Sequence, residues 1–178
     1  NTGVAADVTE SVTTTEEQTT DSQETTEVTE EEKPSLVDET LAGMTLHEKV
    51  CQMMFVTPEE LTGEDGVTVA GDATRQALEN YPVGGIVYFA KNLESQDQVK
   101  EMIANSQKYS SIGLFVATDE EGGVVNRLMD TVGTTYIGSM YYYKDDGDET
   151  AYENAYTIAN DMSALGFNLD FAPVADVW

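Results

Sequence analysis

The feature that most constrains the fold is an alternation of apolar runs with segments of helical periodicity, which begins at Ser35. Short runs rich in β-branched and aromatic residues are typical of buried strands. Four such runs occur, at residues 53–57, 83–89, 113–118 and 167–177. Near-continuous apolar strands separated by helices indicate a parallel α/β sheet, because the strands of such sheets are covered on both faces.

The segments between the strands carry signals for helix ends. Thr45–Glu48 and Ser95–Gln98 each have the pattern of a capping box, followed by apolar residues at helical spacing. The spacing over 151–165 predicts a long helix that is closed by a C-cap glycine. Residues 58–73 contain Gly and Asp and are expected to form a loop, which leads to a short helix ending near Tyr81.

A polar or loop-forming group follows each predicted strand: Thr57, Lys91-Asn92, Asp119-Glu120 and Asp176. A doubly wound sheet would usually have a Gly-rich phosphate loop after its first strand, and none is present there. Functional groups at the ends of several strands favour a (β/α)8 TIM barrel instead. A complete barrel needs about 250 residues. We therefore expect residues 35–178 to be the N-terminal part of one, with about the first four β/α units.

Residues 1–34 differ in composition from the rest of the chain. They are dominated by Thr and Glu and contain no aromatic residue, Leu or Ile. Such a segment buries too little apolar surface to offset its ordering entropy, which predicts a disordered linker, with an acidic binding tail as the alternative. Linkers of this composition are common in exported bacterial proteins. We therefore expect an extracellular or cell-surface location, with anchoring through a segment before Asn1.

The chain has 34 acidic and 8 basic residues and a formal net charge of −26. Nucleic acid and anionic lipid both require Lys and Arg to neutralise phosphate, so this composition argues against either partner. The single cysteine, Cys51, excludes an internal disulfide and lies in an apolar helical pattern that favours burial. The single histidine, His47, has no Cys or His partner at metal-ligand spacing and is expected on a helix surface.

The segment ATDEEGGVVNRL, residues 117–128, places three consecutive carboxylates before two glycines at a strand end. Adjacent anions repel and paired glycines increase the entropy lost on folding, so stability alone does not explain the pattern. Carboxylates can accept paired hydrogen bonds from sugar hydroxyls, and glycines let the backbone approach a ligand. Arg127 could hold one carboxylate through a bidentate pair. The alternative interpretation is a solvated acidic turn with a glycine bend.

Four segments together resemble the N-terminal domain of family 3 glycoside hydrolases, in that family's order and at about its spacing. They are MTLHEKVCQM, VGGIVYF with the Lys91-Asn92 pair after it, ATDEEGGVVNRL, and GFNLDFAPVADV. The nearest branch is that of the bacterial β-N-acetylhexosaminidases, and the resemblance covers about residues 41–178.

The resemblance implies substrate-binding roles for four residues. Asp119 matches the aspartate that holds hydroxyls of the sugar in the −1 subsite, and Glu121 and Arg127 belong to the same motif. Asp176 matches an aspartate that positions other polar groups of the site. The role of Asn92 is expected to be structural.

Two positions depart from the family pattern, Glu120 and Val124. Many relatives have Gln at the first and Arg or a small polar residue at the second. An added carboxylate beside Asp119 could alter hydroxyl recognition or raise the pKa of a neighbouring group.

The resemblance implies a retaining β-glycosidase that works through a covalent glycosyl-enzyme intermediate and needs no metal or organic cofactor. In the family the nucleophilic aspartate lies on a later strand. The acid/base of the hexosaminidase branch is a histidine in a KH-x-PGHG-type loop. No residue of this chain matches either role, since His47 lies elsewhere. We therefore assign no catalytic residue and expect this chain alone to be inactive, with exposed strand edges.

The expected partner is a carbohydrate with terminal β-linked N-acetylglucosamine, from peptidoglycan or a chitin-type oligosaccharide. The alternatives are a β-glucosidase or β-xylosidase of the same family and a non-catalytic surface protein that binds carbohydrate. A tyrosine cluster could stack on sugar rings, although packing is the favoured interpretation. It consists of Tyr136, Tyr141, Tyr142 and Tyr143.

Overall fold

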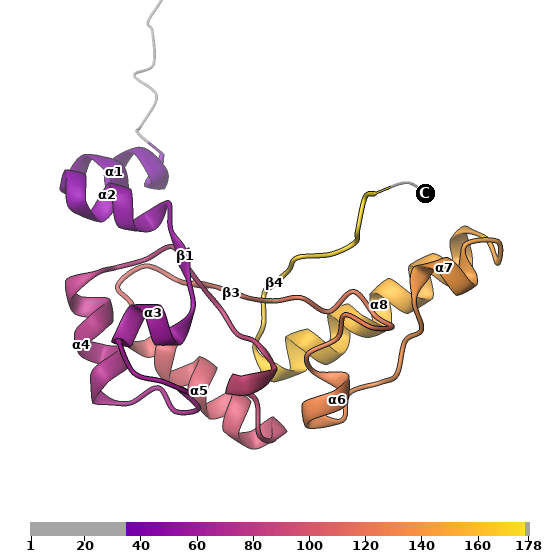
Figure 1. Ribbon diagram of the computed structural model, residues 1–178. Coiled ribbons are helices and arrows are strands. Elements are labelled where there is room, and N and C mark those ends of the chain that lie inside the picture. Colours follow the sequence, from indigo (N-terminus) through magenta and orange to yellow (C-terminus); the bar gives the residue numbers. More distant parts are fainter. Residues whose placement is uncertain (1–34, 177–178) are drawn as a thin grey trace, which may run out of the picture. The chain divides into compact units, whose positions relative to one another are not determined.

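The computed structural model describes residues 35–176, and the predicted disordered linker at 1–34 lies outside the described residues (Figure 1). The strands are β1 (Phe55–Val56), β2 (Gly85–Val87), β3 (Phe115–Thr118) and β4 (Leu169–Asp170). The helices are α1 (Leu36–Gly43), α2 (Leu46–Gln52), α3 (Pro58–Thr62), α4 (Asp72–Asn80), η1 (Ala90–Asn92), α5 (Gln96–Tyr109), α6 (Met129–Val132), α7 (Met140–Tyr143) and α8 (Asp148–Leu165).

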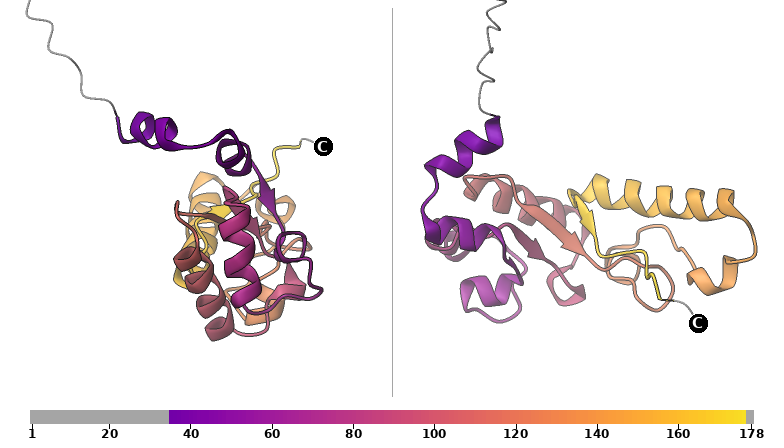
Figure 2. Two further views of the ribbon diagram at one scale, coloured as in Figure 1. Left: turned by 90° about the vertical axis from the view of Figure 1, so that its left-hand side faces the viewer. Right: turned by 90° about the horizontal axis from the view of Figure 1, so that it is seen from above.

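The four strands form one parallel sheet in the order β1-β2-β3-β4, so each strand pairs with the next one along the chain (Figure 2). This confirms the predicted parallel α/β sheet. The paired segments are shorter than the apolar runs that predicted them, and β2 occupies only the middle of 83–89. Residues beyond the strands still support the sheet, since the Tyr88 N–H donates to the Ala117 carbonyl at 2.9 Å.

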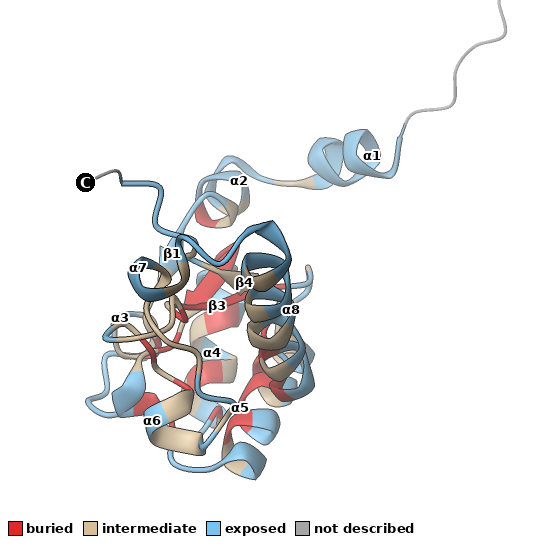
Figure 3. Cartoon of the chain, turned by 90° about the vertical axis from the view of Figure 1, so that its right-hand side faces the viewer, coloured by how far each residue is buried: buried red, intermediate tan, exposed pale blue. Residues whose placement is uncertain are grey.

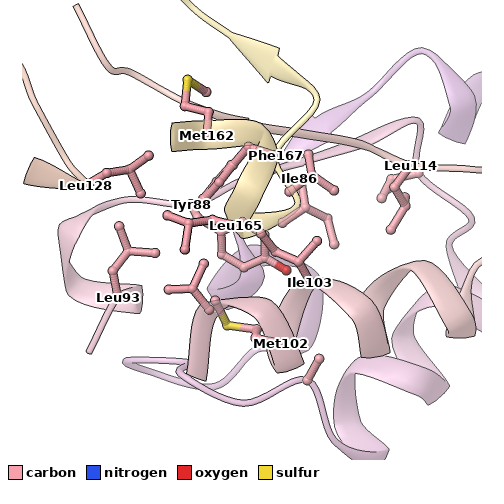
Figure 4. Packing of buried hydrophobic residues seen from close by; sticks show 14 of the residues in the cluster. Ile86, Tyr88, Leu93, Met102, Ile103, Leu114, Leu128, Met162, Leu165 and Phe167 are labelled. Carbon is pink, nitrogen blue, oxygen red and sulfur yellow. The ribbon is translucent and has the colours of Figure 1, made fainter. Parts of the chain in front are cut away.

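The core lies between one face of the sheet and helices α4, α5 and α8, whose buried residues meet there (Figure 3). Ile86 and Tyr88 are each only 1% exposed within it (Figure 4). The Tyr88 ring packs edge-on against Phe167 with centroids 6.2 Å apart, and its hydroxyl lies 3.0 Å from Ser106 Oγ. Burial raises the pKa of Tyr88 to about 12. The phenol therefore stays neutral and its one polar atom is hydrogen-bonded, as a buried hydroxyl requires.

The opposite face of the sheet carries three phenylalanines that remain partly exposed, Phe55, Phe115 and Phe171. The Phe55 ring stacks on Phe115 at 5.9 Å and meets Phe171 edge-on at 5.9 Å. Gly85 is paired with both Phe55 and Phe115 in the sheet register, and a Cβ at this position would lie 2.4 Å from the Phe55 ring. Glycine is therefore required here so that two rings can meet across the central strand.

The structure confirms one of the two predicted capping boxes in full and the other only in part. Thr45 and Glu48 form a reciprocal capping box, as predicted. Ser95 accepts the Gln98 N–H, but the Gln98 side chain bonds elsewhere. Its Oε1 accepts the Glu94 N–H at 2.9 Å and its Nε2 donates to the Thr68 carbonyl at 2.6 Å. The second predicted box is therefore wrong in its return bond, because Gln98 ties a preceding loop to α5.

Helices α1, α3, α6 and α7 and the short 3-10 helix η1 were not predicted. Helix α1 begins after a capping box formed by Ser35 and Asp38, and none of its residues is buried. Helix α3 lies inside the segment predicted as a loop and begins with Thr57 as N-cap and Pro58 in the first turn. Five residues are too few for apolar periodicity, although proline after a capping threonine is a recognised start signal. None of the helices within 35–176 is long and apolar enough to cross a membrane.

Candidate functional site

The polar groups of the site gather where β3 and β4 end. Asp119 follows β3 directly, and Asp170 is the last residue of β4. Because these strands are parallel neighbours, their carboxyl ends lie side by side. The Glu120 N–H donates to Asp170 Oδ1 at 2.9 Å, which joins the two strand ends directly.

Arg127 pairs with Asp119, one of the three carboxylates that the sequence left open as its partner, and the geometry differs from the predicted one. Arg127 Nη2 lies 3.1 Å from Asp119 Oδ2, and the two side chains are 28% and 24% exposed. The pair has one such contact, so the predicted bidentate geometry is wrong. Among residues 35–176 no hydrogen bond reaches the buried Arg127 Nε. The guanidinium instead lies over the Phe89 ring, 5.7 Å from its centroid, within cation–π range.

Glu120 is buried, with 5% of its surface exposed, and its carboxylate accepts three backbone N–H groups. Oε2 accepts Arg127 N at 2.6 Å and Leu128 N at 2.8 Å, and Oε1 accepts Met129 N at 3.3 Å. Charge-assisted bonds of this kind are stronger than neutral ones. The carboxylate that departs from the family pattern is thus engaged by its own loop.

Gly122 and Gly123 have positive φ angles of 83° and 65°. A Cβ on Gly123 would lie 2.7 Å from Ser139 Cβ, and the Gly123 N–H donates to the Ile137 carbonyl at 2.9 Å. The expectation that these glycines bring the backbone close to a ligand stays a prediction. The close neighbour of this turn is the chain's own segment before α7.

The environment of Asp170 raises its pKa to about 6. Burial is the main cause, and the charges of Glu120, Asp119 and Glu121 add to it, while the hydrogen bond from the Glu120 amide opposes it. This agrees with the expectation that an added carboxylate raises a neighbour's pKa. Asp170 itself was missed, because the run FNLDFAPVADV carries two aspartates and only Asp176 was identified as a site residue.

Glu120, Glu121 and Asp170 border a cavity of about 570 Å³ that is also lined by α7, α8 and the segment after β4. Its wall is mostly apolar and includes Ile158, Met162 and Pro173. Asp119 and Arg127 do not line this cavity. The ion pair therefore lies outside the cavity, and Glu120, which bonds the Arg127 backbone, lies between the two.

Asp176 lies beyond β4 and is exposed. No hydrogen bond or ion pair within residues 35–176 involves its side chain. The structure thus brings together Asp119 and Arg127, places Glu121 at the cavity, and joins Asp176 to neither. Its positioning role stays a prediction.

The structural role expected for Asn92 is confirmed, because this side chain is fully buried. Its Nδ2 donates to Glu59 Oε1 at 2.6 Å and to the Val67 carbonyl at 2.9 Å, and its Oδ1 accepts the Phe89 N–H at 2.9 Å. Asn92 thereby fixes the backbone of Phe89, whose ring lies under Arg127. Glu59 belongs to α3, in the segment predicted as a loop, and was not foreseen.

Of the four tyrosines in the cluster, only Tyr143 is partly buried, as the favoured packing interpretation requires. Tyr136, Tyr141 and Tyr142 are 71%, 64% and 83% exposed. The rings of Tyr141 and Tyr142 meet edge-on, and Lys144 Nζ lies 5.1 Å from the Tyr141 centroid.

His47 and Cys51 occupy the positions that the sequence predicted. His47 is exposed on α2, with Nε2 2.9 Å from the Asn80 carbonyl oxygen, and Cys51 is buried. The histidine therefore contacts the end of α4 and not the Asp119 loop. Within the described part of the chain no cluster of three or more metal-ligating side chains occurs.

Fold and site together define an α/β domain of parallel strands with polar groups at the strands' carboxyl ends, the usual location of sites in such sheets. Residues 45–178 match the sequence profile of the glycosyl hydrolase family 3 N terminal domain. The chain belongs to this family.

Relatives and solved structures agree with this assignment. The chain is 33% identical over 110 residues to a β-hexosaminidase A of Pseudoalteromonas piscicida, covering 57% of this chain and 18% of that protein. A family 3 β-N-acetylglucosaminidase from Paenibacillus sp. matches with a TM-score of 0.64 and 33% identity, over 73% of this chain and 24% of that chain.

NagZ from Neisseria gonorrhoeae, in complex with N-trifluoroacetyl-D-glucosamine, matches with a TM-score of 0.57 and 25% identity, over 70% of this chain and 36% of that chain. The sequence thus spans less than two fifths of each of these relatives.

Proposed function

We propose that this chain is the substrate-binding N-terminal part of a retaining β-N-acetylhexosaminidase. The observation that carries the proposal is the Asp119–Arg127 pair at the carboxyl end of a parallel strand. Arg127 contacts one oxygen of the Asp119 carboxylate, and no hydrogen bond within residues 35–176 uses the other oxygen. A carboxylate held in this way can accept hydrogen bonds from sugar hydroxyls.

We propose further that the sheet is part of a (β/α)8 barrel, with about its first four β/α units in residues 35–178. The strand order supports this, because it follows the chain without the reversal that defines a doubly wound sheet. The partly exposed phenylalanines support it too, since the inner face of a barrel is filled by side chains from several strands.

In the proposed reaction a carboxylate nucleophile forms a covalent glycosyl-enzyme and a second group serves as acid and base. Neither role is assigned to a residue of this chain. Its contribution is binding: Asp119 orients the sugar, and Arg127 and Phe89 fix the orientation of Asp119. The proposal includes no metal ion or organic cofactor.

Terminal β-linked N-acetylglucosamine, from peptidoglycan or a chitin-type oligosaccharide, is the proposed substrate. The names of the relatives favour it over the glucosides and xylosides of other family 3 enzymes, and the Neisseria protein was solved with an N-acylated glucosamine. The Asp119 geometry would serve a non-catalytic carbohydrate-binding protein equally well, so turnover decides between the two. An exported or cell-surface location remains part of the proposal, supported by the Thr- and Glu-rich composition of 1–34.

The test compares Asp119→Ala with wild type in the full-length protein, using p-nitrophenyl N-acetyl-β-glucosaminide. We expect kcat/KM to fall about 100-fold or more, the size of effect typical for removal of one group that stabilises the transition state. Asp65→Ala is the matched control, because Asp65 is exposed and lies in the loop before α4. Equal turnover by wild type and Asp119→Ala would contradict the binding role, and preference for a β-glucoside would favour the alternative branch.

A further inference from the structure

Glu120 connects the two partners of the Asp119–Arg127 pair by a second route. It is the sequence neighbour of Asp119, and its carboxylate accepts the Arg127 N–H at 2.6 Å. The Arg127 side chain returns to Asp119 at 3.1 Å. The contacts therefore close a ring: Asp119 carboxylate, Arg127 guanidinium, Arg127 backbone, Glu120 carboxylate and the peptide that joins residues 119 and 120.

The ring is anchored on both sides. Asp170 accepts the Glu120 N–H at 2.9 Å, which fixes the ring to β4. Leu128, which is fully buried, donates its N–H to the same Glu120 oxygen as Arg127, at 2.8 Å. A buried amide without a partner is costly, so the path of the loop from 121 to 129 depends on an acceptor at position 120.

We propose that Glu120 is a positioning residue for sugar binding, which holds the Arg127 backbone so that its guanidinium meets Asp119. The inference rests on the proposed function, because it assigns Glu120 a role in the site where Asp119 would bind the sugar. Glu120 acts through Arg127: its carboxylate is engaged by three amides, and the residue is only 5% exposed although it borders the cavity.

Two substitutions separate the contributions of this side chain. Glu120→Ala removes all three acceptor contacts. Glu120→Gln keeps one carbonyl oxygen for Arg127 and Leu128 but turns an amide NH₂ toward the Met129 N–H, whose present contact is the longest at 3.3 Å. We expect the glutamine variant to retain most of the loop order and the alanine variant to lose it.

Gln107 provides a matched structural control. Its side chain also bonds the backbone in two places, accepting Leu114 N at 2.9 Å and donating to Leu114 O at 2.8 Å. Leu114 directly precedes β3, so these bonds lie at the strand's opposite end from Asp119. Gln107→Ala therefore weakens the fold without touching the ring.

Amide hydrogen exchange on the 178-residue chain tests the structural half of the inference. In Glu120→Ala the amides of Arg127, Leu128 and Met129 should exchange at least about tenfold faster than in wild type, because each loses its acceptor. They should be unchanged in Gln107→Ala. Unchanged protection in both Glu120 variants would overturn the inference, whatever the enzyme assay shows.

A double-mutant cycle in the full-length protein tests the functional half, with kcat/KM on the same aryl N-acetylglucosaminide. Glu120→Ala should lower kcat/KM about 10- to 100-fold, since misplacing a binding group by about 1 Å has effects of this size. Adding Glu120→Ala to Arg127→Ala should cause no further loss of kcat/KM. The separate losses caused by Gln107→Ala and Arg127→Ala should instead multiply in the double variant.

The positioning role would be overturned if the losses of kcat/KM caused by Glu120→Ala and Arg127→Ala multiplied in the double variant. It would also be overturned if Glu120→Ala kept the wild-type kcat/KM. Absence of turnover by the wild-type protein would instead contradict the proposed function. The exchange experiment would then still decide whether Glu120 holds the loop.

Discussion

The two faces of the sheet differ sharply although they share the same strands. On β3, Val116 is fully buried, while its neighbour Phe115 is 55% exposed. Val116 belongs to the core under α4, α5 and α8, whereas Phe115 meets Phe55 across Gly85 on the other face. The strands thus carry apolar residues on both faces, and the described helices cover one of them.

The largest expected effect comes from the covered face. Ile86→Ala removes a side chain that is 1% exposed in the middle of β2, and we expect it to lower the free energy of unfolding by about 2–5 kcal/mol. The reason is the loss of transfer free energy together with the cavity that remains. Urea denaturation followed by circular dichroism measures the change.

Leu46→Ala serves as the control for this substitution. Leu46 is a comparable aliphatic residue that is 78% exposed on α2. If the two variants lost equal stability, the assignment of the core to one face would be wrong.

An intermediate effect is expected from Asp170, the last residue of β4. The folded state raises the pKa of this carboxyl from 3.8 to about 6. Between these pH values the folded protein keeps a proton that the unfolded chain releases. The contribution of Asp170 to stability is therefore most favourable near pH 4, falls as pH rises toward 6, and is level above that.

Asp170→Asn should remove this pH dependence while keeping an acceptor for the Glu120 N–H. Relative to wild type, the variant should gain about 1 kcal/mol of unfolding free energy between pH 4 and pH 6.5, a figure discounted for solvent access. Thermal unfolding at a series of pH values measures it. A wild-type profile that runs parallel to that of Asp170→Asn would contradict the raised pKa.

The sequence predicted the features that depend on neighbours along the chain. The four strand runs, the Thr45 capping box and the long helix before Gly166 were all found where local pattern indicated them. A pair between Arg127 and a carboxylate of the same motif was also foreseen, and the structure identifies that carboxylate as Asp119. Local spacing is sufficient in these cases because the contacts span few residues.

Contacts between distant segments were harder to predict. The partner of the Glu120 amide is Asp170, and the pairing of Thr118 with Asp170 in the sheet register determines that contact. No local pattern distinguishes Asp170 from Asp176 as the group at the strand end. The Gln98 side chain similarly does not make its predicted capping bond and donates to the Thr68 carbonyl instead. Only tertiary packing brings this loop residue near α5.

The smallest effect is expected on the open face, and it also tests the barrel. Phe115→Ala in the 178-residue chain should change the free energy of unfolding by less than about 1 kcal/mol, because the ring is 55% exposed before any substitution. If this face is the inside of a barrel in the full-length protein, the same substitution there should cost about 3–5 kcal/mol, as for a buried aromatic residue. Denaturation of both lengths, with Ile86→Ala as the reference in each, gives the comparison. An equally small loss in the full-length protein would mean that this face stays open, and the barrel proposal would fail with it.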